Sequence, residues 1–199
     1  AEQRLREDEE KLRNIFDSSP NSITITDLKG VVIDCNQQTL DLNGVRQKRD
    51  MLGMNAINLI SEKDRRRARE NLKKTLAGQS VQNVEYEIQT PTGKTIPVSL
   101  SASVLKDANG VPEYFMAILT DISERVKAEQ AVREREQWFR RLADTTATAI
   151  FIYQGEKFVY VNHSTELLTG YSQAELLSMR FYDVVHPDDQ DLVRNRGMA

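Results

Sequence analysis

The stretch that decides the fold runs from Ile25 to Gly44 and reads ITDLKGVVIDCNQQTLDLNG, because a second copy of its pattern follows 126 residues later. That copy runs from Phe151 to Gly170 and reads FIYQGEKFVYVNHSTELLTG. Four positions are identical without a gap: Asn36 and Asn162, Thr39 and Thr165, Leu42 and Leu168, and Gly44 and Gly170. The alternation of apolar residues also coincides, so we interpret the chain as containing an internal repeat.

The first copy begins with two predicted strands and a short helix. Residues 22–26 alternate isoleucine with serine or threonine, which is the period of a half-buried strand. Turn residues at 27–30 lead into a second strand over Val31 to Cys35. Asn36 is suited to cap a short helix, and Gly44 is a favourable residue for its end.

A longer helix and three more strands complete the first copy. Ser61 and Asp64 have the spacing of a capping box, and the helix that they begin has an apolar stripe of Ala68, Leu72 and Leu76. The three strands are expected at Val84 to Ile88, Ile96 to Leu105 and Tyr114 to Thr120, with glycine-containing turns between them. The order of two strands, helices and three strands predicts an α+β fold with an antiparallel sheet.

After Asp121 the apolar period changes from that of a strand to that of a helix. Asp121 and Glu124 have capping-box spacing, and acidic residues repeatedly precede basic ones by four positions. We therefore divide the chain into an amphipathic helix over residues 1–20, a first domain over 21–121, a connecting helix over 122–142 and the N-terminal half of a second domain over 143–199.

Composition excludes several classes of protein. The 199 residues are 39% hydrophobic and 29% charged, which is typical of a globular protein, and the net charge of −3 argues against a partner held by charge over the whole surface. The single cysteine, Cys35, excludes an internal disulfide and suits the reducing cytoplasm, where we expect the protein. No apolar run is long enough to span a membrane, and the amino end has no signal-peptide pattern. Because the chain does not begin with methionine, we interpret it as a piece of a longer protein.

With this layout, the chain resembles tandem PAS (sensory box) domains of a prokaryotic signal-transduction protein, such as a sensor histidine kinase or a cyclic-dinucleotide enzyme. The resemblance covers Leu12 to Asp121 as a full domain and Leu142 to Ala199 as about half of another. Its most specific motif is Asp121-Ile122-Ser123, where the family has Asp-Ile-Thr. It implies a five-stranded antiparallel sheet with helices on one face, and a non-catalytic module that receives a small-molecule, redox or protein signal. It also implies that the signal leaves through the helix after Asp121 toward an output domain, for which no motif occurs in this sequence.

The resemblance includes branches that hold haem or flavin, and the first copy departs from both. Haem-binding members take a histidine from the long helix, and the first copy contains no histidine. In the flavin-binding LOV branch a reactive cysteine lies on a helix, whereas Cys35 ends a strand, and polar residues bind the flavin ring at the positions occupied here by Ile88, Val98 and Leu119. We therefore predict no cofactor and a colourless protein. Two alternatives stay open: a flavin held in a different way, and an unidentified small ligand.

Strand alternation predicts that seven side chains point inward: Tyr86, Ile88, Val98, Leu100, Ala102, Ala117 and Leu119. Any pocket that they line is mostly apolar, with Tyr86 as its hydrogen-bonding group. Two interpretations remain open: a filled core without a ligand, and a site for a small apolar or weakly polar ligand.

Three functions follow from these patterns, with a sensory module first and a structural dimerising spacer second. The third is nucleic-acid binding through the basic stretch 63–74, but its apolar stripe and interspersed acidic residues favour a solvated helix face. We predict no nucleic-acid partner, no membrane partner and a homodimer formed through the flanking helices. The apolar positions on those helices are Leu5, Leu12, Ile15 and Phe16, and then Val132, Trp138, Phe139 and Leu142.

The junction after the first domain is the expected signal relay. Asp121 has the spacing to cap the connecting helix, and Arg125 follows one turn later, within reach of an ion pair. An ordinary helix cap is the alternative interpretation. The second copy has no counterpart of the last three strands, so we expect residues beyond about Leu142 to be loosely folded, swapped or docked against a neighbour.

Overall fold

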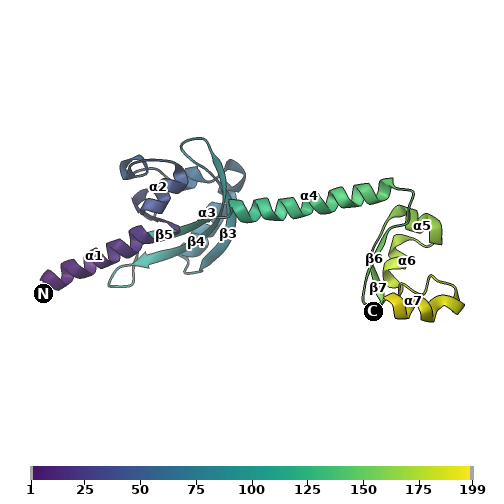
Figure 1. Ribbon diagram of the computed structural model, residues 1–199. Helices are drawn as coiled ribbons and strands as arrows, with labels where there is room; N and C mark the ends of the chain where they lie inside the picture. The colour runs from purple at the N-terminus through teal and green to yellow at the C-terminus, as the bar shows by residue number, and fades with distance from the viewer. Residues whose placement is uncertain (1, 198–199) are drawn as a thin grey trace. The chain divides into compact units, whose positions relative to one another are not determined.

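The computed structural model describes residues 2–197, apart from the side chains of Glu2 and Leu5. The chain divides into two compact units, residues 1–127 and 128–199, and each is described here by itself (Figure 1). Within residues 2–197, no helix combines the length and the apolar character that crossing a membrane requires.

The first unit is built on a five-stranded sheet with the order β2-β1-β5-β4-β3, in which every neighbouring pair is antiparallel. Helix α1 (Glu2–Ser18) precedes the sheet. The strands are β1 (Ser22–Thr26), β2 (Val32–Cys35), β3 (Val81–Gln89), β4 (Thr95–Lys106) and β5 (Pro112–Asp121). The predicted α+β fold with a five-stranded antiparallel sheet is confirmed, and the first strand pairs with the last.

Short helices lie between β2 and β3 and pack on the sheet. They are α2 (Gln37–Asn43), η1 (Lys48–Asp50), η2 (Ala56–Leu59) and α3 (Glu62–Leu76). The side chain of Asn36 accepts a hydrogen bond from the Thr39 amide at the start of α2, and Gly44 ends that helix with φ of 67°, a conformation that favours glycine. Ala68 of α3 packs with Tyr86 and Val98 of the sheet, so the main core lies between α3 and strands β3 and β4.

Two details of α3 differ from the expectation. The Ser61 side chain makes no capping hydrogen bond and instead donates to Oδ2 of Asp64 over 3.4 Å. The same oxygen accepts the Glu87 amide of β3 at 3.2 Å. Leu76 is 41% exposed, whereas Thr75 is buried. At 3.6 residues per turn Thr75 projects almost in line with Ala68, while Leu76 projects about 80° away.

Strand β1 alternates as predicted, but the face that it buries is the one with hydroxyl groups. Ser22, Thr24 and Thr26 are each at most 6% exposed, whereas the two isoleucines between them are half-buried. The hydroxyl oxygens of Ser22 and Thr39 lie 2.9 Å apart, so α2 meets β1 through a polar contact. Strand β1 therefore contributes a strip of hydroxyl groups to the interior of the first unit.

The second unit begins in helix α4 (Ser123–Thr145), which extends beyond its expected end at residue 142. A two-stranded sheet of β6 (Phe151–Gln154) and β7 (Lys157–Val161) follows. The remaining elements are α5 (His163–Thr169), α6 (Gln173–Ser178), η3 (Pro187–Asp189) and α7 (Gln190–Gly197). Among the described residues β6 pairs only with β7, and all four of its residues are exposed.

Candidate functional site

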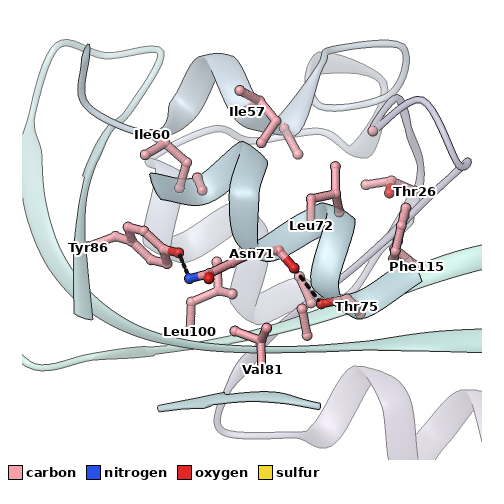
Figure 2. A pocket seen from close by; sticks show the side chains of 15 residues that line it. Thr26, Ile57, Ile60, Asn71, Leu72, Thr75, Val81, Tyr86, Leu100 and Phe115 are labelled. Atoms are coloured by element: carbon pink, nitrogen blue, oxygen red, sulfur yellow. Dashed lines mark hydrogen bonds between the residues drawn. The ribbon is translucent and has the colours of Figure 1, made fainter. Parts of the chain in front are cut away.

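Two neighbouring cavities lie inside the first unit, between the sheet and the helices that cover it. The larger has a volume of about 90 Å³ and the smaller about 60 Å³. Four residues line both cavities: Ala56, Ile60, Leu100 and Ala117. Figure 2 shows the larger cavity, with α3 on one side and strands of the sheet on the other. The two cavities are therefore adjacent and share part of their walls.

Six of the seven side chains predicted to point inward line these cavities. Tyr86 and Ala102 line the larger cavity, Ile88 and Leu119 line the smaller, and the shared residues Leu100 and Ala117 line both. The seventh, Val98, is fully buried in the core cluster with Ile60 and Ala68 and lines neither cavity. Val98 therefore fills the core.

The larger cavity contains a hydrogen-bonded pair of polar side chains. Nδ2 of Asn71 on α3 donates to the hydroxyl of Tyr86 on β3 over 2.7 Å, as the dashed line in Figure 2 shows. The Thr75 hydroxyl donates to the backbone carbonyl of Asn71. On the same tyrosine, the Arg67 guanidinium lies 4.6 Å from the ring centroid, within the range of a cation–π interaction. Tyr86, the predicted polar group of the pocket, is thus held by α3 in two ways.

The smaller cavity is lined by three polar residues, Ser22, Thr24 and Asn43. Nδ2 of Asn43 donates to the Thr39 carbonyl over 2.8 Å, which fixes the orientation of the amide. Its Oδ1 is buried and accepts no hydrogen bond from any described residue. A buried acceptor without a partner is costly, so this oxygen is placed to accept a hydrogen bond from a donor that enters the cavity.

Sequence reasoning missed both asparagines. Asn71 lies three residues after Ala68 and one before Leu72, so it is a polar residue within the apolar stripe of α3. Asn43 immediately precedes the glycine that ends α2, where a polar residue is common. A polar residue in an apolar stripe could have indicated the role of Asn71 from the sequence. The position of Asn43 at the end of a helix could not.

The cavities offer no charged chemistry. No charged side chain is among the described residues that line either of them. Nor do residues 2–197 bring together three histidine, cysteine, aspartate or glutamate side chains as a metal site would require. The arrangement is suited to bind an uncharged molecule by apolar contact and a few hydrogen bonds.

The junction after β5 brings together Asp121, the start of α4 and strand β3. Oδ1 of Asp121 accepts the Ser123 amide over 2.8 Å, so the aspartate does cap the turn into α4. Nη2 of Arg125 lies 2.7 Å from Oε1 of Glu85 on β3, a partner that the sequence spacing did not indicate. In the sheet Ser99 of β4 pairs with Glu85 on one side and with Thr120 on the other, so a long arginine side chain can reach β3.

Asn36 ties the end of helix α1 to the first domain. Its Oδ1 accepts the amide of Ile23 at 2.9 Å, and both the amide and the hydroxyl of Thr39. Its Nδ2 donates to the carbonyls of Phe16 at 3.0 Å and of Asn21 at 2.9 Å. One fully buried side chain thus joins the helix, the first strand and α2.

Asn162 repeats this arrangement in the second unit. Its Oδ1 accepts the Ile150 amide and both donors of Thr165, and its Nδ2 donates to the carbonyls of Ala143 and Thr148. The two copies of the repeat therefore share this set of hydrogen bonds as well as their sequence pattern. In each unit these bonds hold the helix that precedes the first strand.

Several basic side chains of the stretch 63–74 bind groups within the first domain. Lys63 pairs with Glu87 at 2.7 Å, and Arg65 donates to the carbonyls of Ile60 and Asn58. Arg67 donates to the Glu85 carbonyl in addition to contacting Tyr86. Three of its seven basic side chains therefore stabilise the fold, which weakens the case for a nucleic-acid surface.

Two models of known protein families match the sequences of these two units. A family model described as PAS domain matches residues 20–124, which is more than half of the chain. The chain belongs to the PAS domain family. A second model, described as PAS fold, matches residues 137–197, so the second PAS unit is recognised although its residues up to 197 form only two strands.

Relatives of this PAS chain include sensor proteins. Sporulation kinase A of Bacillus subtilis is 22% identical over 92% of this chain, and methyl sulfide methyltransferase-associated sensor of Methanosarcina acetivorans is 33% identical over 65% of it. The chain spans only 30% and 14% of the lengths of these two relatives. The crystal structure of the PAS domain of an HTR-like protein from Haloarcula marismortui matches with a TM-score of 0.53, covering 61% of this chain and 97% of that one at 22% identity, which supports the fold.

Proposed function

We propose that this chain is the sensory part of a signal-transduction protein, in which the first PAS domain binds a small molecule and passes the signal into α4. The observation that carries the proposal is the position of β3, which contributes both to the cavity and to the contact with α4. Tyr86 on this strand lines the larger cavity, and the adjacent Glu85 binds Arg125. The two side chains point to opposite faces, as neighbours in a strand do.

The relay that follows from this arrangement has two steps. A ligand that competes for Asn71 changes the hydrogen bond that holds Tyr86, and thereby the position of β3. A shift of β3 then changes the contact between Glu85 and Arg125 at the first turn of α4, whose start is fixed by Asp121. Asp121 and Arg125 are thus the exit residues of this proposal, and Glu85 is the partner that sequence spacing did not indicate.

The partners in this proposal are an output domain in the same protein and a second copy of the chain. The names of two relatives, a sporulation kinase and a sensor histidine kinase of Ectopseudomonas mendocina, support an output domain of the histidine-kinase type. The exposed apolar positions of α1 and α4 support a homodimer formed through these helices. A cytoplasmic location is compatible with Cys35, which is a free thiol.

The test uses the full-length protein that contains this chain, with output activity measured with and without its stimulus. We expect Glu85→Gln and Asp121→Ala to reduce the ratio of stimulated to unstimulated activity, because each alters the junction with α4. Glu113→Gln, on the exposed part of β5, serves as a control for removal of a carboxylate from the sheet. A full wild-type response in both junction variants would contradict the relay.

A structural spacer is the alternative function, and ligand binding separates it from the proposal. Native mass spectrometry of the purified chain, before and after incubation with a library of small uncharged metabolites, is the direct measurement. A bound molecule that protects the amides of β3 and α3 from hydrogen exchange supports the sensory function. The absence of any such molecule, together with wild-type output activity in Glu85→Gln and Asp121→Ala, supports the spacer.

A further inference from the structure

We infer that the smaller cavity accepts an uncharged molecule with a hydroxyl or N–H group, which donates a hydrogen bond to Oδ1 of Asn43. This inference rests on the proposed ligand-binding function and specifies the chemistry of the ligand. Asn43 lines the cavity, is only 3% exposed and has its other amide atom committed to the Thr39 carbonyl. The orientation of the amide is therefore fixed, and its oxygen is left to accept.

The second PAS unit provides an internal comparison for this residue. Thr169 occupies the position equivalent to Asn43, at the end of α5 and just before the glycine that caps it. Its hydroxyl donates to the Thr165 carbonyl over 2.8 Å, the same bond that Nδ2 of Asn43 makes to Thr39 at the same distance. The structural bond therefore needs only a hydroxyl. What the asparagine adds in the first unit is a buried carbonyl oxygen.

The neighbouring polar groups do not supply the missing donor. The Ser22 and Thr24 hydroxyl oxygens lie 2.9 and 3.5 Å from the hydroxyl oxygen of Thr39, and the Thr39 hydroxyl lies 2.9 Å from the carbonyl of Ile23. These groups form a network on the side of β1 and α2. A ligand that carries its own donor satisfies Asn43 without disturbing this network.

Size and charge restrict the ligand further. The smaller cavity, of about 60 Å³, holds only the polar end of such a ligand. A ligand that displaces shared wall side chains and extends into the larger cavity, of about 90 Å³, would occupy roughly the 150 Å³ of an apolar cavity that holds benzene. No charged side chain among the described residues lines them, so an ion would lose its hydration without compensation. The geometry therefore points to a small neutral alcohol, or an equivalent N–H compound, on a body of about six carbon atoms.

The experiment compares cyclohexanol with cyclohexanone, which have the same ring but differ in whether the oxygen can donate. Binding to the isotopically labelled chain is measured from NMR shifts of residues that line the smaller cavity. We expect cyclohexanol to bind about tenfold more tightly than cyclohexanone, because only the alcohol gives Asn43 a partner.

The matched variant is Asn43→Thr, which copies the residue found in the second unit and keeps the structural bond. We expect it to remove the preference for the alcohol while leaving the fold unchanged. Asn58→Thr, the same substitution at an exposed position, should leave both affinities unchanged.

Three other outcomes would overturn the inference. Equal binding of both probes, with shifts in the cavity, would show that Asn43 does not select a donor, while the proposed sensory function would stand. A preference that survives in Asn43→Thr would place the donor contact elsewhere in the cavity. Binding of neither probe at millimolar concentration would overturn the inference and would also remove the cavity as support for the sensory function.

Discussion

At the scale of single residues, Asn36 and Asn162 do more than cap a short helix. Each uses its oxygen to accept from an amide in or just before the first strand and from the following helix, and its nitrogen to donate to the last turn of the preceding helix. No other side chain type of this size provides an acceptor and two donors at one point. One buried amide side chain therefore binds the last turn of the helix that enters each PAS unit.

We expect Asn36→Ala to destabilise the first unit by about 2–3 kcal/mol, since it leaves several buried backbone groups without partners. It should also release the C-terminal end of α1, because the hydrogen bond to the Phe16 carbonyl is lost. Urea unfolding measures the first effect, and hydrogen exchange of residues 12–18 measures the second. Gln37→Ala, at the adjacent exposed position, is the control, and equal stability of the two variants would contradict the anchoring role.

The attachment of α1 should also depend on pH through Asp34. Partial burial alone would raise the pKa of this carboxyl, but hydrogen bonds from Lys48, the Cys35 amide and Arg13 outweigh it and hold the pKa below its usual value. Because the folded-state pKa is lowered, the stabilisation is present above the unfolded pKa near 4 and is lost as the pH falls through the folded-state pKa.

Arg13 is the residue of α1 that makes this contact, with Nη1 at 3.0 Å from Oδ2 of Asp34. We therefore expect the amides of α1 to lose protection below about pH 4. Asp34→Asn should remove this pH dependence, whereas Asp107→Asn, in the β4–β5 turn, should not. An unchanged acid response in Asp34→Asn would assign the effect to other carboxylates.

At the scale of elements, the turn from β5 into α4 is held by two separate contacts. Asp121 caps the turn through its side chain, and the Ile122 amide donates to the Pro97 carbonyl of β4. We expect Asp121→Ala to cost about 0.5–2 kcal/mol locally and to increase hydrogen exchange over residues 122–126, while the sheet remains protected. Asp121→Asn keeps the accepting oxygen and should behave like the wild type. Loss of protection across β4 and β5 would mean that Asp121 supports the whole domain.

Strands β1 and β6 occupy equivalent places in the two repeats but differ in their surroundings. Strand β1 pairs with β2 and β5, whereas β6 pairs only with β7 among the described residues. Because a two-stranded sheet is marginally stable, we expect the amides of β6 to exchange about 100-fold faster than those of β1. Equal protection of the two strands would show that the second unit is stable as it stands or that a partner covers its edge.

The comparison of these elements shows what the sequence could predict. Element order, the antiparallel sheet and the apolar side chains that point inward follow from periodicity, whereas periodicity left open whether those side chains line a cavity. The buried face of β1 does not follow, because alternation has the same period whichever face is inside. The pair of Glu85 and Arg125 joins residues 40 positions apart, so no local spacing indicates it. The polar groups of the cavity, Asn43 and Asn71, were missed because their roles depend on tertiary neighbours.

At the scale of the whole molecule, the unpaired apolar side chains of the helices are the feature to test. Leu12 and Ile15 of α1 and Val132, Trp138 and Leu142 of α4 are all at least 49% exposed. Two other side chains that were expected at the dimer contact have partners within the chain. Phe16 lies against Arg13 and Lys48, and Phe139 lies against Tyr160. The side chain of Leu5 lies outside the described part of the structure.

We expect the chain to form a dimer at micromolar concentration, and Leu12→Glu combined with Trp138→Glu to weaken it at least tenfold, because the charges would enter a buried apolar contact. Sedimentation equilibrium measures the association. Gln137→Glu adds the same charge next to Trp138 and should leave the dimer intact. A wild-type chain that remains monomeric at high micromolar concentration would contradict the proposed homodimer.

The hydroxyl face of β1 has a consequence for mutational tolerance. In a saturation mutagenesis screen for folding, valine or leucine at Ser22 or Thr24 would rank among the damaging changes, since they break the network with Thr39. Threonine or serine at Ile23 and Ile25, which are only half-buried, would rank among the accepted ones. A hydropathy scale would order these substitutions the other way, so variants of this strand should be judged by hydrogen-bond partners before hydrophobicity.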